Sequence, residues 1–124
     1  VMALFIRGIC GPDYHRRAVE AASALLGSLG YGRAEKPWLA IGGAVHSGLA
    51  YVGNVGGEVV DFTALGDTVN TAARLAASAG SGEVLLSDPV HSRVGGSLSD
   101  LERRTLTLRG KELPVDAWVL GLNR

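Results

Sequence analysis

The sequence lacks several features that define whole classes of protein. It has a single cysteine, Cys10, so no disulfide forms within the chain and a cytoplasmic setting is favoured. Its longest near-continuous apolar stretch, Val1 to Ile6, is far short of the roughly 20 residues that cross a bilayer. Twelve Lys and Arg balance twelve Asp and Glu, so the basic character of a nucleic-acid-binding domain is missing. We therefore expect neither a membrane span nor a nucleic-acid partner.

Motifs of several enzyme classes are missing as well. There is no Gly-x-x-x-x-Gly-Lys-Ser/Thr phosphate loop, no His-Glu-x-x-His and no Cys-x-x-Cys pair. Ser47 lacks the glycine two residues before it that a nucleophile elbow requires, so it is not expected to be a catalytic nucleophile.

Glycine is the residue present in excess. Its 18 copies among 124 residues are about twice the ordinary share of roughly 7%. Seven of them fall between Gly42 and Gly66, where the backbone must turn tightly or approach another group closely. The length suits one domain, and the apolar share of 47% suits a packed core. Function should be sought in the glycine-rich middle of this single domain.

Apolar spacing and turn residues predict interleaved helices and strands. Helices are expected over 13–29, closed by Gly30, over 68–79, capped by Asp67, and over 89–94, with proline in the first turn. Strands are expected over 1–6, 38–46, 49–54, 58–64, 84–87, 103–109 and 115–121. Ser47-Gly48 is expected to join the second and third of these strands as a hairpin. The pattern favours an α+β fold with a mixed or antiparallel sheet and helices on one face.

Two polar residues stand out on the helix expected at 68–79. Asn70 and Arg74 are four residues apart and therefore project from the same side of the helix. Small apolar residues form the adjacent face: Val69, Ala72, Ala73 and Ala76. One face is expected to pack while its neighbour presents an amide and a guanidinium.

The residues around this helix carry a family resemblance. The segment Gly42 to Gly56, followed by Asp61-Phe62-Thr63, by Gly66-Asp67-Thr68-Val69-Asn70 and by Ala73-Arg74-Leu75, resembles the class III adenylyl and guanylyl cyclase catalytic domain of bacterial type. The resemblance extends in register from Val1 to the end of the chain. It implies a ferredoxin-like sheet that lacks the family's first strands, so that residues 1–124 form one catalytic domain incomplete at its N-terminal side.

The resemblance also implies an activity and roles for residues. Members pair head to tail and convert a nucleoside triphosphate to a cyclic 3′,5′-monophosphate and pyrophosphate between two domains. Asn70 matches the asparagine that orients the ribose, and Arg74 matches the arginine that stabilises charge on the α-phosphate. Thr63 falls where the family reads the purine and favours ATP over GTP. Either Arg109 or Lys111 matches the lysine that binds the terminal phosphates.

The metal ligands expected of the family are not matched in this chain. Members hold two Mg²⁺ or Mn²⁺ ions through two aspartates, and both positions lie upstream of Val1. Phosphoryl chemistry without these ligands should be very slow, so the isolated chain is expected to be inactive. Two interpretations remain. The first is an adenylate cyclase domain of a cytoplasmic, homodimeric signalling enzyme, which upstream residues of the parent protein would anchor or regulate. The second is a catalytically silent module that binds nucleotide or a partner domain.

Overall fold

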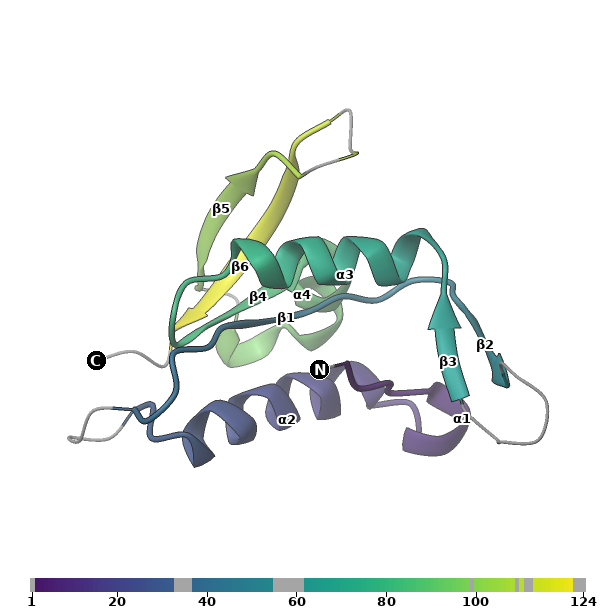
Figure 1. Cartoon of the computed structure of the whole chain (residues 1–124), viewed down its shortest axis with the longest axis horizontal. Helices are drawn as coiled ribbons and strands as arrows, with labels where there is room; N and C mark the ends of the chain where they lie inside the picture. The colour runs from purple at the N-terminus through teal and green to yellow at the C-terminus, as the bar shows by residue number, and fades with distance from the viewer. Residues whose placement is uncertain are drawn as a thin grey trace.

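The residues that the structure describes form six strands and four α-helices. The computed structural model describes residues 2–32, 37–54, 62–98, 100–108, 110 and 113–121. The helices are α1 (Arg7–Cys10), α2 (Tyr14–Ser28), α3 (Asp67–Ser78) and α4 (Asp88–Val94), with a short 3₁₀ turn at Gly96–Leu98. The strands are β1 (Gly43–Val45), β2 (Tyr51–Asn54), β3 (Phe62–Leu65), β4 (Glu83–Ser87), β5 (Glu102–Leu106) and β6 (Val115–Gly121). Figure 1 shows their arrangement.

Strand β4 lies inside the main sheet. The strand order is β1-β4-β6-β5, in which β1 runs parallel to β4 while β6 is antiparallel to both β4 and β5. Val84, Leu85 and Leu86 are completely buried, because a strand inside the sheet is covered on both faces. Successive side chains point to opposite faces, so β4 contributes to a core on each side.

Helices α2 and α4 cover one face of the sheet. Val84 and Leu86 pack there in a cluster with residues of both helices: Val19, Leu26, Val90 and Val94. Leu85 faces the other way and packs beneath α3 with Leu75, Leu108, Ala117 and Val119. A mixed sheet flanked by helices confirms the expected fold class. The expectation that the helices lie on one face is wrong, because α3 packs on the Leu85 face and α2 and α4 pack on the opposite one (Figure 1).

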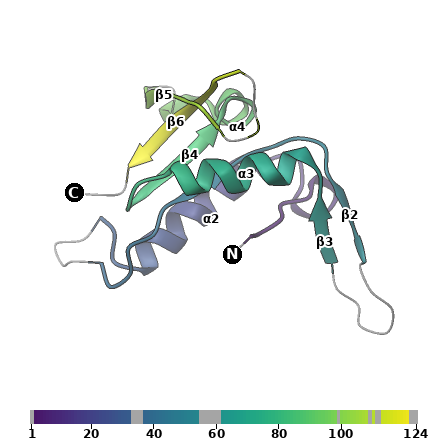
Figure 2. The same ribbon diagram turned by 45° about the horizontal axis from the view of Figure 1, so that its top comes forward.

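Strands β2 and β3 form a separate hairpin. They pair antiparallel, with Gly53 opposite Thr63, and project beyond the four-stranded sheet from the beginning of α3 (Figure 2). The chain passes from β3 into α3 through Gly66, whose φ of 126° belongs to the region that favours glycine. The hairpin is thus connected directly to the helix that carries Asn70 and Arg74.

The helix predictions are confirmed within one or two residues. Helix α2 corresponds to the helix expected at 13–29, and α3 corresponds to the helix expected at 68–79. Helix α4 corresponds to the helix expected at 89–94 and has Pro89 in its first turn. The prediction that Asp67 caps α3 is wrong by one position, because Gly66 is the N-cap and Asp67 is the first helical residue. Within the described ranges, no helix has the length and apolar character needed to cross a membrane.

Two strand predictions are wrong. A buried strand was expected at 1–6, but residues 2–6 form no strand. No described strand pairs with this segment, so Met2 and Leu4 are exposed. The segments around Ser47-Gly48 do not pair with each other. Instead β1 pairs with β4 and β2 pairs with β3, so 46–50 is a connection between two sheets rather than a hairpin turn.

Candidate active site

Helix α3 places the two candidate catalytic residues on one side. Thr71 and Leu75, 4% and 0% exposed, form its buried side and fix its rotation about the helix axis. Asn70 is exposed and Arg74 is half-buried, one turn apart on the adjacent side. Asn70 and Arg74 thus lie on one side of the helix, as their spacing predicts. The expected packing face is wrong, because Thr71 and Leu75 are buried whereas Ala73 is exposed.

Close contacts hold the loop before β2 against the beginning of α3. A Cβ at Gly48 would lie 2.7 Å from Oγ1 of Thr68, and that hydroxyl donates a hydrogen bond to the carbonyl of Leu49. Only a residue without a side chain allows this approach. Part of the glycine excess thus serves to join the β2–β3 hairpin to the helix that carries Asn70.

Thr63 is placed by its backbone on β3. It lies three residues before Gly66, at which the chain enters α3, and its β-bridge partner is Gly53. The strand bearing the proposed purine-reading position and the first turn of the helix bearing Asn70 therefore adjoin. Arg109 and Lys111 lie outside the described residues.

Gly110, between those two cations, is described and contacts Arg74. A Cβ at Gly110 would lie 2.9 Å from Nη1 of Arg74, and 3.3 Å from both Cζ and Nη2. The Arg74 guanidinium thus rests against the backbone of the turn between β5 and β6. Sequence reasoning did not identify this contact, and its signal was a glycine flanked by two cations in Leu108-Arg109-Gly110-Lys111.

Arg74 is not engaged by an acidic side chain in this part of the molecule. Among the described residues, the ion pairs are those of Arg104 with Glu83 and Glu102, and no hydrogen bond is made by the Arg74 guanidinium. Its donors are available to an anion. A guanidinium presents several N–H groups in a planar fork, which suits a phosphate or a developing phosphoryl charge.

The side chains with shifted pKa values, Glu83 and His15, are not among the predicted site residues. Two hydrogen bonds from Arg104, at 2.9 and 3.0 Å, and one from the Gly80 N–H lower the pKa of Glu83. Burial and the nearby positive charge of Arg93 lower the pKa of His15. His15 Nε2 and Ser47 Oγ share a hydrogen bond of 2.9 Å. No described carboxylate bonds to His15, so this contact links α2 to the loop after β1 and does not form a catalytic triad.

Metal ligands do not come together in the described ranges. No group of three or more His, Cys, Asp or Glu side chains there is arranged to hold a metal ion. The described residues therefore do not form the two-ion site that the resemblance implies.

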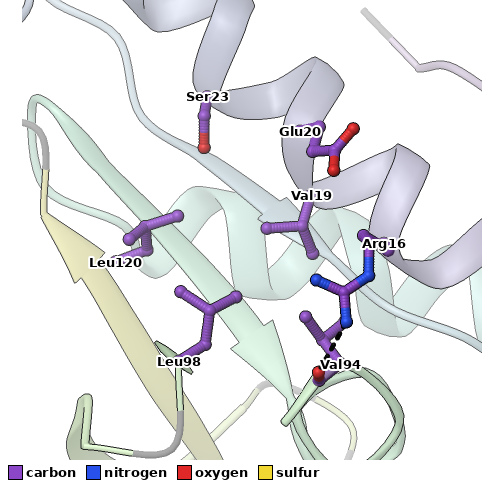
Figure 3. A pocket seen from close by; sticks show the side chains of 7 residues that line it. All are labelled: Arg16, Val19, Glu20, Ser23, Val94, Leu98 and Leu120. Atoms are coloured by element: carbon purple, nitrogen blue, oxygen red, sulfur yellow. Dashed lines mark hydrogen bonds between the residues drawn. The ribbon is translucent and has the colours of Figure 1, made fainter. Parts of the chain in front are cut away.

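A hollow of about 370 Å³ lies away from these residues, on the α2 side of the sheet (Figure 3). Its lining comes from α2, from the end of α4 and the following turn, and from β6: Arg16, Val19, Glu20, Ser23, Val94, Leu98 and Leu120. Arg16 donates a hydrogen bond to the Val94 carbonyl across it. None of the predicted site residues lines this hollow, so it is separate from the candidate active site.

A family model matches most of the chain, and solved structures share its fold. The profile of the adenylate and guanylate cyclase catalytic domain matches residues 18–121. The chain is similar in structure to the guanylate cyclase domain of RhGC from Catenaria anguillulae in complex with GTP, with a TM-score of 0.63 and 23% identity over 89% of this chain and 61% of that one. No curated protein matches the chain in sequence.

Two further solved structures show the same fold. The catalytic core of a rhodopsin-guanylyl cyclase with converted specificity, in complex with ATPαS, has a TM-score of 0.64 and 28% identity over 89% of this chain and 60% of that one. The adenylyl cyclase CyaB from P. aeruginosa has a TM-score of 0.51 and 22% identity over 90% of this chain and 55% of that one. The chain thus spans less than two thirds of the length of these structures.

Proposed function

The chain belongs to the adenylate and guanylate cyclase catalytic domain family, and from this premise we propose that it supplies one half of an active site that converts ATP to cyclic AMP and pyrophosphate. The other half comes from a second cyclase domain, in a homodimer or a pair of related domains. In this reaction the ribose 3′-oxygen forms a bond to the α-phosphorus, the bond from that phosphorus to the pyrophosphate oxygen breaks, and the 3′-hydroxyl loses its proton.

Arg74 is proposed to stabilise the negative charge that grows on the α-phosphate. The observation that supports this role is a half-buried guanidinium on α3 without an acidic partner among the described side chains. Preorganised donors aimed at developing charge commonly contribute about 3 to 4 kcal/mol of transition-state stabilisation. Asn70, exposed one turn earlier, is proposed to hold the ribose through its amide and so to orient the attacking hydroxyl.

The turn between β5 and β6 is proposed to bind the terminal phosphates through Arg109 or Lys111. Both residues adjoin Gly110, which contacts the Arg74 guanidinium. A triphosphate whose α-phosphate lies at Arg74 would therefore have a cation-bearing turn beside it, which is what a chain of linked phosphates requires.

The choice of ATP as substrate rests on Thr63. Its place on β3, in the strand that leads into α3, suits a side chain that reads the purine while Asn70 holds the ribose. The related structures include proteins solved with GTP and with ATPαS, so adenine preference is a proposal about Thr63 alone. The Mg²⁺ or Mn²⁺ ligands are proposed to precede Val1 in the parent protein or to come from the partner domain.

A complementation experiment tests this proposal. The chain is mixed with a full-length class III adenylyl cyclase subunit in which the residues equivalent to Asn70 and Arg74 are replaced by alanine, and cyclic AMP is measured with ATP and Mn²⁺. We expect the chain alone to be inactive and the mixture to recover activity, with ATP preferred over GTP. Absence of recovery when the two proteins co-elute as a complex would instead favour the silent module that binds a partner domain.

A further inference from the structure

Helix α3 begins without the side-chain cap that stabilises many helix ends. Its N-cap is Gly66, which has no side chain to accept a hydrogen bond from the first backbone N–H groups. The first bond of the helical ladder joins the Asn70 N–H to the Gly66 carbonyl, at 3.2 Å. Helix ends open more readily than helix centres, and Asn70 lies in the turn that would open.

A hydroxyl in this first turn is bonded to a segment outside the helix. Thr68 Oγ1 donates a hydrogen bond to the Leu49 carbonyl, in the connection between β1 and β2. This connection passes the beginning of α3 before it enters the β2–β3 hairpin (Figure 1). Threonine is branched at Cβ and takes few rotamers in a helix, so the bond also restrains the backbone of the turn that bears it.

The connection is itself held on both sides. On the side of α2, His15 Nε2 and Ser47 Oγ share a hydrogen bond of 2.9 Å. On the side of α3, a Cβ at Gly48 would lie 2.7 Å from Oγ1 and 3.1 Å from Cγ2 of Thr68. Gly48 does not have the positive φ that favours glycine, so its close approach to Thr68 is what requires glycine here.

We propose that Thr68 is a positioning residue for Asn70, an inference that rests on the proposed function and deepens it. The bond from Thr68 to the Leu49 carbonyl supplies the stabilisation that a cap would give, and it keeps the first turn of α3 closed. None of the described residues hydrogen-bonds to the exposed Asn70 side chain, so the position of its amide depends on the helix backbone. Thr68 thus fixes, from two residues away, where the amide meets a ribose.

Hydrogen exchange at the Asn70 N–H tests this bond on the chain alone, without substrate. Thr68→Val removes the hydroxyl and keeps a branched side chain of similar helix propensity. We expect exchange to become about 3- to 10-fold faster, which is the factor that one hydrogen bond commonly contributes to such an equilibrium. Thr68→Ser, which keeps the hydroxyl, should stay within about twofold of the original chain. Unchanged exchange in Thr68→Val would overturn the proposal.

Thr105→Val is the matched control, because it makes the same substitution at a distant hydrogen bond. Thr105 Oγ1 donates to Oδ1 of Asp116 at 2.9 Å, between β5 and β6. Exchange at the Asn70 N–H should stay within about twofold of the original chain in this variant. Equal acceleration in Thr105→Val and Thr68→Val would show a general loss of stability and would contradict the proposal.

A double-mutant comparison tests whether Gly48 acts through Thr68. Gly48→Ala places a Cβ against the Thr68 hydroxyl and should accelerate exchange at the Asn70 N–H about as much as Thr68→Val does. In a chain that already carries Thr68→Ala, the two atoms that the new Cβ would approach most closely are absent, so Gly48→Ala should change exchange no further. The same acceleration in both backgrounds would contradict the proposal.

The complementation assay measures the consequence for the reaction. Thr68→Val should lower kcat about 10-fold with little change in KM for ATP, because misplacement of a group by about 1 Å has effects of up to about 100-fold. Thr68→Ser should restore most of kcat, and Thr105→Val should keep it within about twofold. A loss in Thr68→Ser as large as that in Thr68→Val would overturn the role of the hydroxyl. Failure of the original chain to complement, with the expected exchange changes, would contradict only the cyclase activity.

Discussion

The two faces of strand β4 pack against different helices. Val84 and Leu86 point into a core closed by two helices, α2 and α4. Leu85 points into a smaller core covered by α3 (Figure 1). Neither α2 nor α4 carries a residue predicted for the active site, whereas the outward side of α3 carries Asn70 and Arg74.

The two faces of the sheet thus separate the residues that stabilise the fold from those proposed for the chemistry. Because successive side chains of a strand alternate, β4 anchors both layers without mixing them. The inner side of α3 is fixed by Leu75, and its outer side remains free to present polar groups. Substitutions on the α2 and α4 face should therefore change stability, and substitutions on the outer side of α3 should change catalysis.

The largest expected effect on stability is at Leu86. Leu86→Ala removes a completely buried side chain from the α2 and α4 face and leaves a cavity, so the free energy of unfolding should fall by about 2 to 5 kcal/mol. Leu25→Ala on α2, where the side chain is 52% exposed, serves as the matched control and should change it by about 0.5 kcal/mol or less. Urea denaturation measures both. Similar values for the two variants would contradict the division between the faces.

A smaller effect is expected from the pH dependence of stability through His15. Its folded-state pKa is lowered from 6.5 by burial and by Arg93, so the unfolded chain binds the proton more readily. The free energy of unfolding should therefore fall as the pH is reduced from about 7.5 through the unfolded pKa of about 6.5. In His15→Gln this part of the decrease should disappear, as urea titrations between pH 7.5 and 5.5 would measure. An identical pH profile in both proteins would count against it.

Local structure was predictable from the sequence because its signals are local. Helical spacing that includes Tyr14, Ala18 and Leu29 predicts α2 nearly to the residue, and α3 is predicted equally closely. The i, i+4 spacing places Asn70 beside Arg74. The strand expected at 115–121 is β6, with the same bounds. These patterns depend only on neighbours within a few residues.

Pairing between distant segments was not predictable in the same way. The partner of β1 is β4, with Ala44 opposite Leu85, and nothing near Ser47-Gly48 indicates that distant partner. The Arg74 guanidinium on α3 lies beside Gly110, although β4, α4 and β5 separate the two residues along the chain. Sequence patterns predict which residues belong to an element, but packing of the whole chain decides which elements meet.

The outer side of α3 is proposed to supply a catalytic arginine to an active site shared with a second domain. The most direct test compares the chain with its Arg74→Ala variant in the complementation assay, alongside the free energy of unfolding of each. We expect cyclic AMP formation to fall about 10²- to 10³-fold while the free energy of unfolding changes by about 0.5 kcal/mol or less. Undiminished cyclic AMP formation by the Arg74→Ala chain would contradict the account.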